Sequence, residues 1–250
     1  MTRTRNPVRH APGWLLFLAV AGLGLSAASA APAKAVKAAK PAAKPAAYAE
    51  VPDDPALPRV LIIGDSISIG YTPVVRELMK GKANVRRPAT NCAATLTGLK
   101  ELDAWLGAAD KWDVIHFNWG LHDLKYCDEK AVITDVDKGH QQVPVADYEK
   151  NLRTLVERMQ KTGARLIFAT TTPVPEGAKG RVPADVAKYN EAALRVMKDL
   201  GVAVDDLNAA ATPNLAAWQN KKDVHYNATG YKGLAESVVK TVEAELARKP

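Results

Sequence analysis

A serine near the start of the chain and a histidine near its end are the residues best suited to chemistry. Ser66 closely follows an apolar run, and Asp223 and His225 lie far along the chain. A serine hydroxyl is a weak nucleophile unless a base takes its proton, and a histidine oriented by a carboxylate is a common base. The three residues therefore predict a serine esterase, with Ser66 as nucleophile, His225 as general base and Asp223 as the supporting acid.

The apolar run before Ser66 predicts a strand buried on both faces. Val60–Ile63 are branched or large apolar residues, and Gly64 ends the run. In an open α/β sheet, ligands and nucleophiles lie just beyond the carboxyl ends of the strands. Ser66 has that position.

Strand and helix patterns alternate along the rest of the chain. Strands are predicted at 59–64, 83–87, 112–118, 164–170 and 202–205, and helices at 72–80, 97–106, 146–161, 184–200 and 230–247. This order predicts an α/β fold with a central parallel sheet covered by helices on both faces. The loops that follow the strands share one edge, so segments 91–95, 118–123 and 171–175 are expected to lie near Ser66. Segment 121–143 is predicted as a long loop.

Four short motifs, in this order, resemble the blocks of the SGNH/GDSL hydrolase family. They are Gly64-Asp65-Ser66-Ile67, the segment 91–95, Gly120-Leu121-His122-Asp123 and the segment 222–227, and the resemblance extends from Arg59 to about Leu246. It implies a flavodoxin-like three-layer α/β/α sandwich and hydrolysis of esters of lipids, thiols or sugars.

The resemblance also implies an oxyanion hole. Its donors would be the backbone N–H groups of Ser66 and Ala93 and one side chain from the third block. Ala93 stands where the family has glycine, and His122 stands where it has asparagine. A neutral imidazole can donate one N–H, but Asn118 could serve instead, and a structural His122 bonded to Asp123 is a further alternative.

The fourth block departs from the family in its spacing. Asp223 precedes His225 by two residues, whereas the family has Asp-x-x-His. The carboxylate could still reach the ring and complete a triad, or a backbone carbonyl could orient the ring and leave a dyad.

The first 58 residues differ in composition from the rest. Residues 1–30 resemble a signal peptide, with an arginine-containing start, the apolar run Trp14–Leu25 and cleavage expected after Ala30; an uncleaved anchor is the alternative. Residues 31–58 are rich in Ala, Lys and Pro and are expected to be a disordered linker. The hydrolase domain is expected at 59–250, in an exported protein that is periplasmic or secreted.

Charge and cysteine content limit the partners. More than half of the formal net charge of +7 lies in the first 58 residues, and no basic run is interleaved with aromatics, so we expect no nucleic-acid partner. No stable membrane insertion is expected after signal cleavage. No group of residues has metal-ligand spacing, so no metal or cofactor is expected. Cys92 and Cys127 could form a disulfide in an exported protein, or remain buried free thiols.

The substrate is expected to be a small-molecule or polysaccharide ester. Aromatic residues make up only 6% of the chain, and no long apolar segment lies near Ser66 to form a lipid-binding lid. These features do not indicate a large lipid groove, and export, a compact domain and the family resemblance together favour acetyl esters of carbohydrate. The alternatives are a lipase, lysophospholipase or thioesterase with the same catalytic residues, and a non-catalytic sugar-binding module derived from an esterase.

Overall fold

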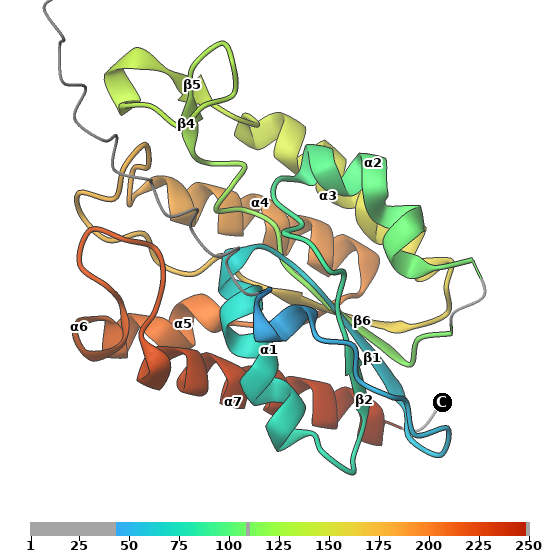
Figure 1. Cartoon of the computed structure of the whole chain (residues 1–250). Coiled ribbons are helices and arrows are strands. Elements are labelled where there is room, and N and C mark those ends of the chain that lie inside the picture. Colours follow the sequence, from blue (N-terminus) through green and yellow to red (C-terminus); the bar gives the residue numbers. More distant parts are fainter. Residues whose placement is uncertain (1–43, 109–110, 249–250) are drawn as a thin grey trace, which may run out of the picture. The chain divides into compact units, whose positions relative to one another are not determined.

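The computed structural model describes residues 44–108 and 111–248 (Figure 1). The predicted signal peptide at 1–30 and the predicted linker up to residue 43 lie outside the described residues. Within the described ranges, no helix has the length and apolar character needed to cross a membrane.

Five parallel strands form the central sheet. Their order is β2-β1-β3-β6-β7, with β1 at Arg59–Ile63, β2 at Asn84–Arg86, β3 at Val114–Phe117, β6 at Arg165–Ala169 and β7 at Ala203–Asp205. This is the strand order of flavodoxin-like folds, and its direction reverses between β1 and β3. The crevice at the carboxyl ends of these two strands is where such sheets bind ligands, and Ser66 follows β1.

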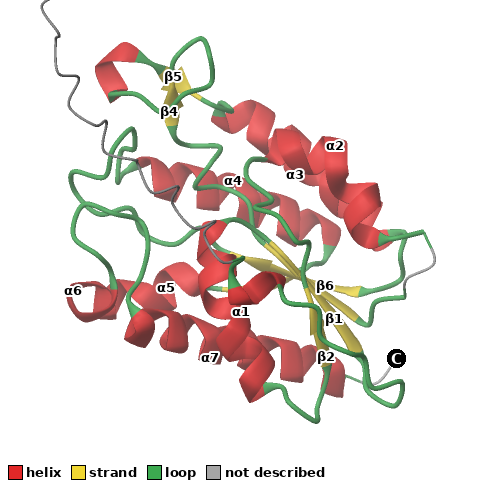
Figure 2. Ribbon diagram, in the orientation of Figure 1, coloured by secondary structure: helices red, strands yellow, loops and turns green. Residues whose placement is uncertain are grey.

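Helices cover both faces of the sheet. On one face lie α1 (Ser66–Leu78) and α7 (Ala228–Ala247), and on the other lie α2 (Thr95–Leu106), α3 (Val145–Gln160) and α4 (Asp185–Leu200) (Figures 1 and 2). The predicted α/β/α sandwich is confirmed. Three short helical elements after β7 were not predicted because they are too short to show a periodic apolar face: α5 (Leu207–Ala211), η3 (Thr212–Asn214) and α6 (Leu215–Trp218).

The close packing of α1 against α7 requires a glycine. A Cβ on Gly70 would lie 2.1 Å from the ring of Tyr231 in α7. Any side chain at this position would therefore have to displace the Tyr231 ring from its place between the two helices. Since Ser66 begins α1 and His225 lies just before α7, this contact helps to set the distance between them.

Helix α1 begins earlier than the predicted range 72–80. Asp65 caps the helix, because its Oδ1 accepts the Ile67 N–H at 2.9 Å. The segment Ser66–Thr72 lacks strong helix formers, and Pro73 suggested a first turn, whereas Pro73 lies inside the helix. As a result Ser66 occupies the first residue of α1.

The predicted disordered linker 31–58 is wrong for residues 44–58. These residues include a 3-10 turn, η1 (Ala46–Tyr48), in which Ala47 is buried. The Asn84 side chain accepts the Asp54 N–H at 2.8 Å and donates to the Asp54 and Leu57 carbonyls. These contacts with β2 produce no apolar periodicity, so composition alone suggested disorder.

The segment 121–143 holds a small insertion (Figure 1). It contains the antiparallel pair β4 (Tyr126–Cys127) and β5 (His140–Gln141) and a 3-10 turn, η2 (Val136–Lys138). The Tyr126 N–H donates to the Gly180 carbonyl at 2.7 Å. This bond fastens the insertion to the loop after β6.

The predicted disulfide between Cys92 and Cys127 is wrong, because both are free and buried. Cys92 is enclosed in the core, its N–H donates to the Gly64 carbonyl, and burial raises its pKa to about 11. Cys127 belongs to β4, where its Sγ lies 3.9 Å from Gln142 Oε1. Each thiol is thus packed within its own element.

Candidate active site

The structure brings the three predicted catalytic residues together. Ser66 Oγ lies 2.8 Å from His225 Nε2, and His225 Nδ1 lies 2.7 Å from Asp223 Oδ1. The same carboxylate oxygen accepts the backbone N–H of His225 at 3.2 Å. This local turn brings the carboxylate to the ring although only one residue separates the two. The geometry is therefore that of a triad.

The loop that carries His225 is fixed on both sides. The Asn220 N–H donates to the His225 carbonyl at 3.0 Å, and Gln219 Nε2 donates to the Pro173 carbonyl at 2.7 Å. Asn227 caps α7, because its Oδ1 accepts the Gly230 N–H at 3.0 Å. The imidazole is therefore anchored to α7 and to the loop after β6.

The Asp223 carboxylate is held in its ionised form. Partial burial pushes its pKa upward, but the hydrogen bonds from His225 outweigh this effect, so its pKa lies below the usual value. The side chains of His225 and Asp223 are 40% and 47% exposed. The site is thus open to solvent on this side.

The backbone N–H of Ser66 is a natural anion donor. Because Ser66 begins α1, its N–H has no helical acceptor, and the positive end of the helix dipole lies beside it. Phosphates and other anions bind at helix N-termini for the same reasons.

Ala93 adopts a left-handed backbone conformation. Its φ is 47°, and its N–H donates to Asn91 Oδ1 at 2.9 Å. The sequence resemblance implied that this N–H faces the oxyanion, whereas the Asn91 side chain already accepts it. Lys222, next to Asp223, also has a positive φ of 55°. Strain of this kind is common in active-site loops.

The two side chains considered for the oxyanion are placed differently. Asn118 Nδ2 donates to the Ala169 carbonyl of β6 at 2.7 Å. The ring of His122 is half-buried and makes no hydrogen bond to any residue in the described ranges. Burial lowers its pKa, although the charge of Asp65 opposes this, so the ring is neutral at pH 7. His122 is therefore the freer donor of the two.

The alternative interpretation, in which His122 is a structural residue bonded to Asp123, is wrong. Asp123 Oδ1 accepts the N–H and the hydroxyl of Thr95, at 2.9 and 2.5 Å. The carboxyl group thus caps α2, whose own N-cap residue is Ala94 and has no side-chain acceptor. Burial raises the pKa of Asp123 to about 7 despite these bonds, and its Oδ2 has no partner in the described chain.

Arg87 is a structural member of the site that the sequence did not reveal. Its buried guanidinium donates to the Gly64 carbonyl at 3.2 Å, to Ser68 Oγ at 2.9 Å and to the Thr90 carbonyl at 3.0 Å. It therefore joins the end of β1, the first turn of α1 and the loop before α2. Nothing in the sequence distinguishes Arg87 from Arg86 as the inward-facing one.

The cavity beside the turn that carries Ser66 is small. Its volume is about 10 Å³, and its lining includes Asp65, Ile67, Tyr71 and Thr172. It can hold about one water molecule. In the described part of the chain, no cluster of three or more His, Cys, Asp or Glu side chains could bind a metal ion.

Comparisons with known proteins agree with this architecture. The model of the "GDSL-like Lipase/Acylhydrolase family" matches residues 62–232. A lipase/acylhydrolase from Enterococcus faecalis is similar in structure, with 20% identity and a TM-score of 0.63 over 77% of this chain and 99% of that one. No curated protein matches the sequence.

Two acetylxylan esterases are also similar in structure. The acetyl xylan esterase AlAXEase has 15% identity and a TM-score of 0.60 over 74% of this chain and 99% of its own. Axe2, an acetylxylan esterase from Geobacillus stearothermophilus, has 17% identity and a TM-score of 0.60 over 77% and 95%. At these identities the likeness supports the fold.

We expect Ala93→Gly to stabilise the protein. Glycine removes the steric penalty of the left-handed conformation, which exceeds its entropic cost, so the free energy of unfolding should rise by about 0.5–1 kcal/mol. Urea unfolding measures this change. Ala192→Gly is the control: Ala192 lies inside α4 and its methyl group is buried, so the same substitution should destabilise. Equal losses in both variants would contradict the backbone geometry of Ala93.

We expect Asp123 to make stability fall between about pH 4 and pH 7. In this range the folded protein keeps the Asp123 proton and the unfolded chain releases it, so the free energy of unfolding decreases as the pH rises. Asp123→Asn removes this dependence and still offers an acceptor to Thr95. Urea unfolding at several pH values should show the wild type losing a few kcal/mol more than the variant, to order of magnitude. The exposed Asp137→Asn serves as control, and parallel curves for wild type and Asp123→Asn would refute a raised pKa.

Proposed function

The chain belongs to the GDSL-like lipase/acylhydrolase family and is an ester-hydrolysing enzyme, and on this premise we propose that it removes acetyl groups from carbohydrate. Ser66, His225 and Asp223 are the proposed catalytic residues. The observation that carries this assignment is the 2.8 Å distance from Ser66 Oγ to His225 Nε2, with Asp223 hydrogen-bonded to the other ring nitrogen.

The proposed reaction is a two-step acyl transfer. His225 takes the proton as Ser66 Oγ attacks the ester carbonyl, and Asp223 stabilises the imidazolium that forms. His225 then returns the proton to the leaving alkoxide, and an acetyl group stays bonded to Ser66 Oγ. A water molecule, deprotonated by His225, releases acetate and restores the serine.

The proposed oxyanion hole consists of the Ser66 N–H and the His122 ring. Both donors are free in the described structure, whereas the Ala93 N–H and one N–H of Asn118 are already donated. The lowered pKa of His122 keeps the ring neutral. A neutral His122 can donate one N–H to the oxyanion, and it places no second positive charge beside the imidazolium that His225 becomes during the reaction.

A bulky alcohol is supported by the open side of the site. The exposed side chains of His225 and Asp223 leave space for an alcohol such as a sugar. Acetylxylan esterases among the similar structures support the same class of substrate. Export is part of the proposal and is supported by the apolar run and the Ala28-Ser29-Ala30 site in residues 1–30.

We expect Ser66→Ala to lose hydrolysis of p-nitrophenyl acetate and labelling by a fluorophosphonate probe. The variant lacks the oxygen that forms the acyl-enzyme, while its circular dichroism and unfolding should match the wild type. Acetate release from acetylated xylan should be lost in parallel. Unchanged hydrolysis would refute the assignment of Ser66, and a wild-type protein that is not labelled would favour the sugar-binding module.

The acyl chain decides between acetylesterase and lipase or thioesterase. We expect kcat/KM to fall along the p-nitrophenyl series from acetate to octanoate, because the proposed natural substrate carries acetyl groups. A preference for octanoate would contradict the proposed substrate and leave the catalytic residues in place.

We expect His122→Ala to lower kcat by about 10²–10³, with a smaller change in KM, because one oxyanion donor is lost. His122→Asn supplies an amide donor at the same position and should recover much of the rate. Steady-state kinetics with p-nitrophenyl acetate measures both variants. A larger loss of kcat in Asn118→Ala than in His122→Ala would assign the oxyanion to Asn118.

A further inference from the structure

Two cations border the proposed active site without an acidic partner. Arg181 lies in the loop after β6, and Lys125 lies immediately before β4 in the insertion. Both side chains are half-buried, and the positive charge of each acts on the His122 ring. We call Arg181 and Lys125 the basic pair.

The Arg181 guanidinium is held in place and keeps free donors. Its Nε donates to the carbonyl of Leu121, the neighbour of His122, at 3.1 Å, and Nη1 donates to the Lys179 carbonyl at 3.4 Å. An arginine carries five N–H donors, so the remaining ones have no acceptor within the described ranges. A planar guanidinium presented in this way can bind a carboxylate or phosphate through two parallel hydrogen bonds.

The backbone that carries Arg181 is fixed against the insertion. A Cβ on Gly180 would lie 2.6 Å from both Ile133 Cγ1 and the Thr134 carbonyl oxygen, and the Tyr126 N–H holds the Gly180 carbonyl. Gly180 also has a positive φ of 58°. The position of the guanidinium beside the site is therefore set before any substrate arrives.

Two carboxylates lie near Arg181, but within the described ranges neither forms a hydrogen bond with it. Asp65 and Asp223 are the acids whose charge reaches it, but Asp65 Oδ1 caps α1 and Asp223 Oδ1 holds His225. Among the described residues, neither Arg181 nor Lys125 forms an ion pair, whereas Arg153 pairs with Asp199. Burial lowers the pKa of Arg181, and the charges of Asp65 and Asp223 oppose this effect only through space. An anionic substrate group in direct contact with the guanidinium would compensate its burial further.

We infer that the basic pair binds an anionic group of the substrate, so that the preferred substrate is an acetylated acidic glycan. This inference rests on the proposed function and narrows its substrate class. A sugar carboxylate, as in a uronic acid, fits the planar guanidinium through two hydrogen bonds, and Lys125 adds a point charge. A phosphate on the sugar has the same chemistry.

Three acetylated monosaccharides separate these cases. The first is the acetylated methyl glycoside of galacturonic acid, the second is its uncharged uronamide, and the third is acetylated galactose 6-phosphate. Acetate release gives kcat/KM for each. We expect the wild type to prefer the uronate over the uronamide by about 10- to 100-fold, the range for a hydrogen bond between charged groups, and to lose this preference as salt is added. A preference for the phosphate over the uronate would assign the basic pair to a phosphorylated glycan.

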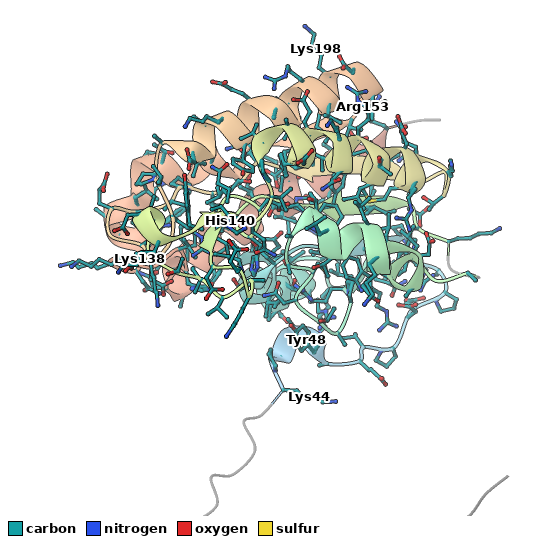
Figure 3. All side chains as sticks on the ribbon, turned by 90° about the horizontal axis from the view of Figure 1, so that it is seen from above. Lys44, Tyr48, Lys138, His140, Arg153 and Lys198 are labelled. Carbon is teal, nitrogen blue, oxygen red and sulfur yellow. The ribbon has the colours of Figure 1, made fainter. Side chains whose placement is uncertain are left out.

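Substitutions then show which residue is responsible for the preference for uronate over uronamide. Arg181→Gln should lower the ratio of uronate to uronamide kcat/KM about 10-fold or more, and Lys125→Gln should lower it less. Arg153→Gln is the control, because it also removes one positive charge, but from α3. Figure 3 shows Arg153 apart from Lys138 and His140, which belong to the same insertion as Lys125. The ratio for Arg153→Gln should equal that of the wild type.

The outcomes for the two proposals differ. Equal kcat/KM for uronate and uronamide in the wild type would overturn the basic pair as a substrate site, and so would an unchanged ratio in Arg181→Gln. If the wild type released acetate from none of the three sugars and failed to hydrolyse p-nitrophenyl acetate, the proposed function itself would fail. Because each variant is judged by a ratio of two substrates, a partly unfolded fraction cancels from the result.

Discussion

The packing of α1 against α7 is the constraint on which the proposed active site depends. Ser66 is the first residue of α1, and His225 lies three residues before α7, so the 2.8 Å contact between them reports how these helices meet. Gly70 allows the approach, because a Cβ there would collide with the ring of Tyr231. Ser66 and His225 are distant in the sequence, and the contact between these helices brings them together. Neither segment alone determines the distance between the two side chains.

Around Ser66 and His225, three positions differ from the pattern of the GDSL family. The acid lies two residues before the histidine, and a local turn in which Asp223 Oδ1 accepts the His225 N–H makes that spacing work. The left-handed conformation that glycine would adopt easily is imposed on Ala93 and held by Asn91. A half-buried, neutral His122 stands in the place of an amide. In the proposed mechanism, each departure keeps a local geometry or a donor and changes the group that provides it.

Much of the fold was predictable, because its signals are local. The run Val60–Ile63 and the apolar faces of the helices follow periods that burial on a sheet demands, and the alternation of strand and helix implies a parallel sheet. The errors have physical reasons. Residues 44–58 are ordered by hydrogen bonds to Asn84, which composition does not reveal. The start of α1 depends on the Asp65 cap, and the pairing of Cys92 with Cys127 depends on distances that spacing along the chain does not give.

The type of chemistry is already present in the order of residues: a serine after a buried strand, a late histidine and a nearby acid, within motifs of one hydrolase family. Which groups act on one another depends on the folded arrangement. It joined Asp223 to the His225 ring, engaged the Ala93 N–H and turned the Asn118 amide toward β6, and it left the His122 ring and the Arg181 guanidinium with free donors. Residue type fixes what a side chain can donate or accept, whereas its partners depend on distance and burial, which arise only when the elements pack.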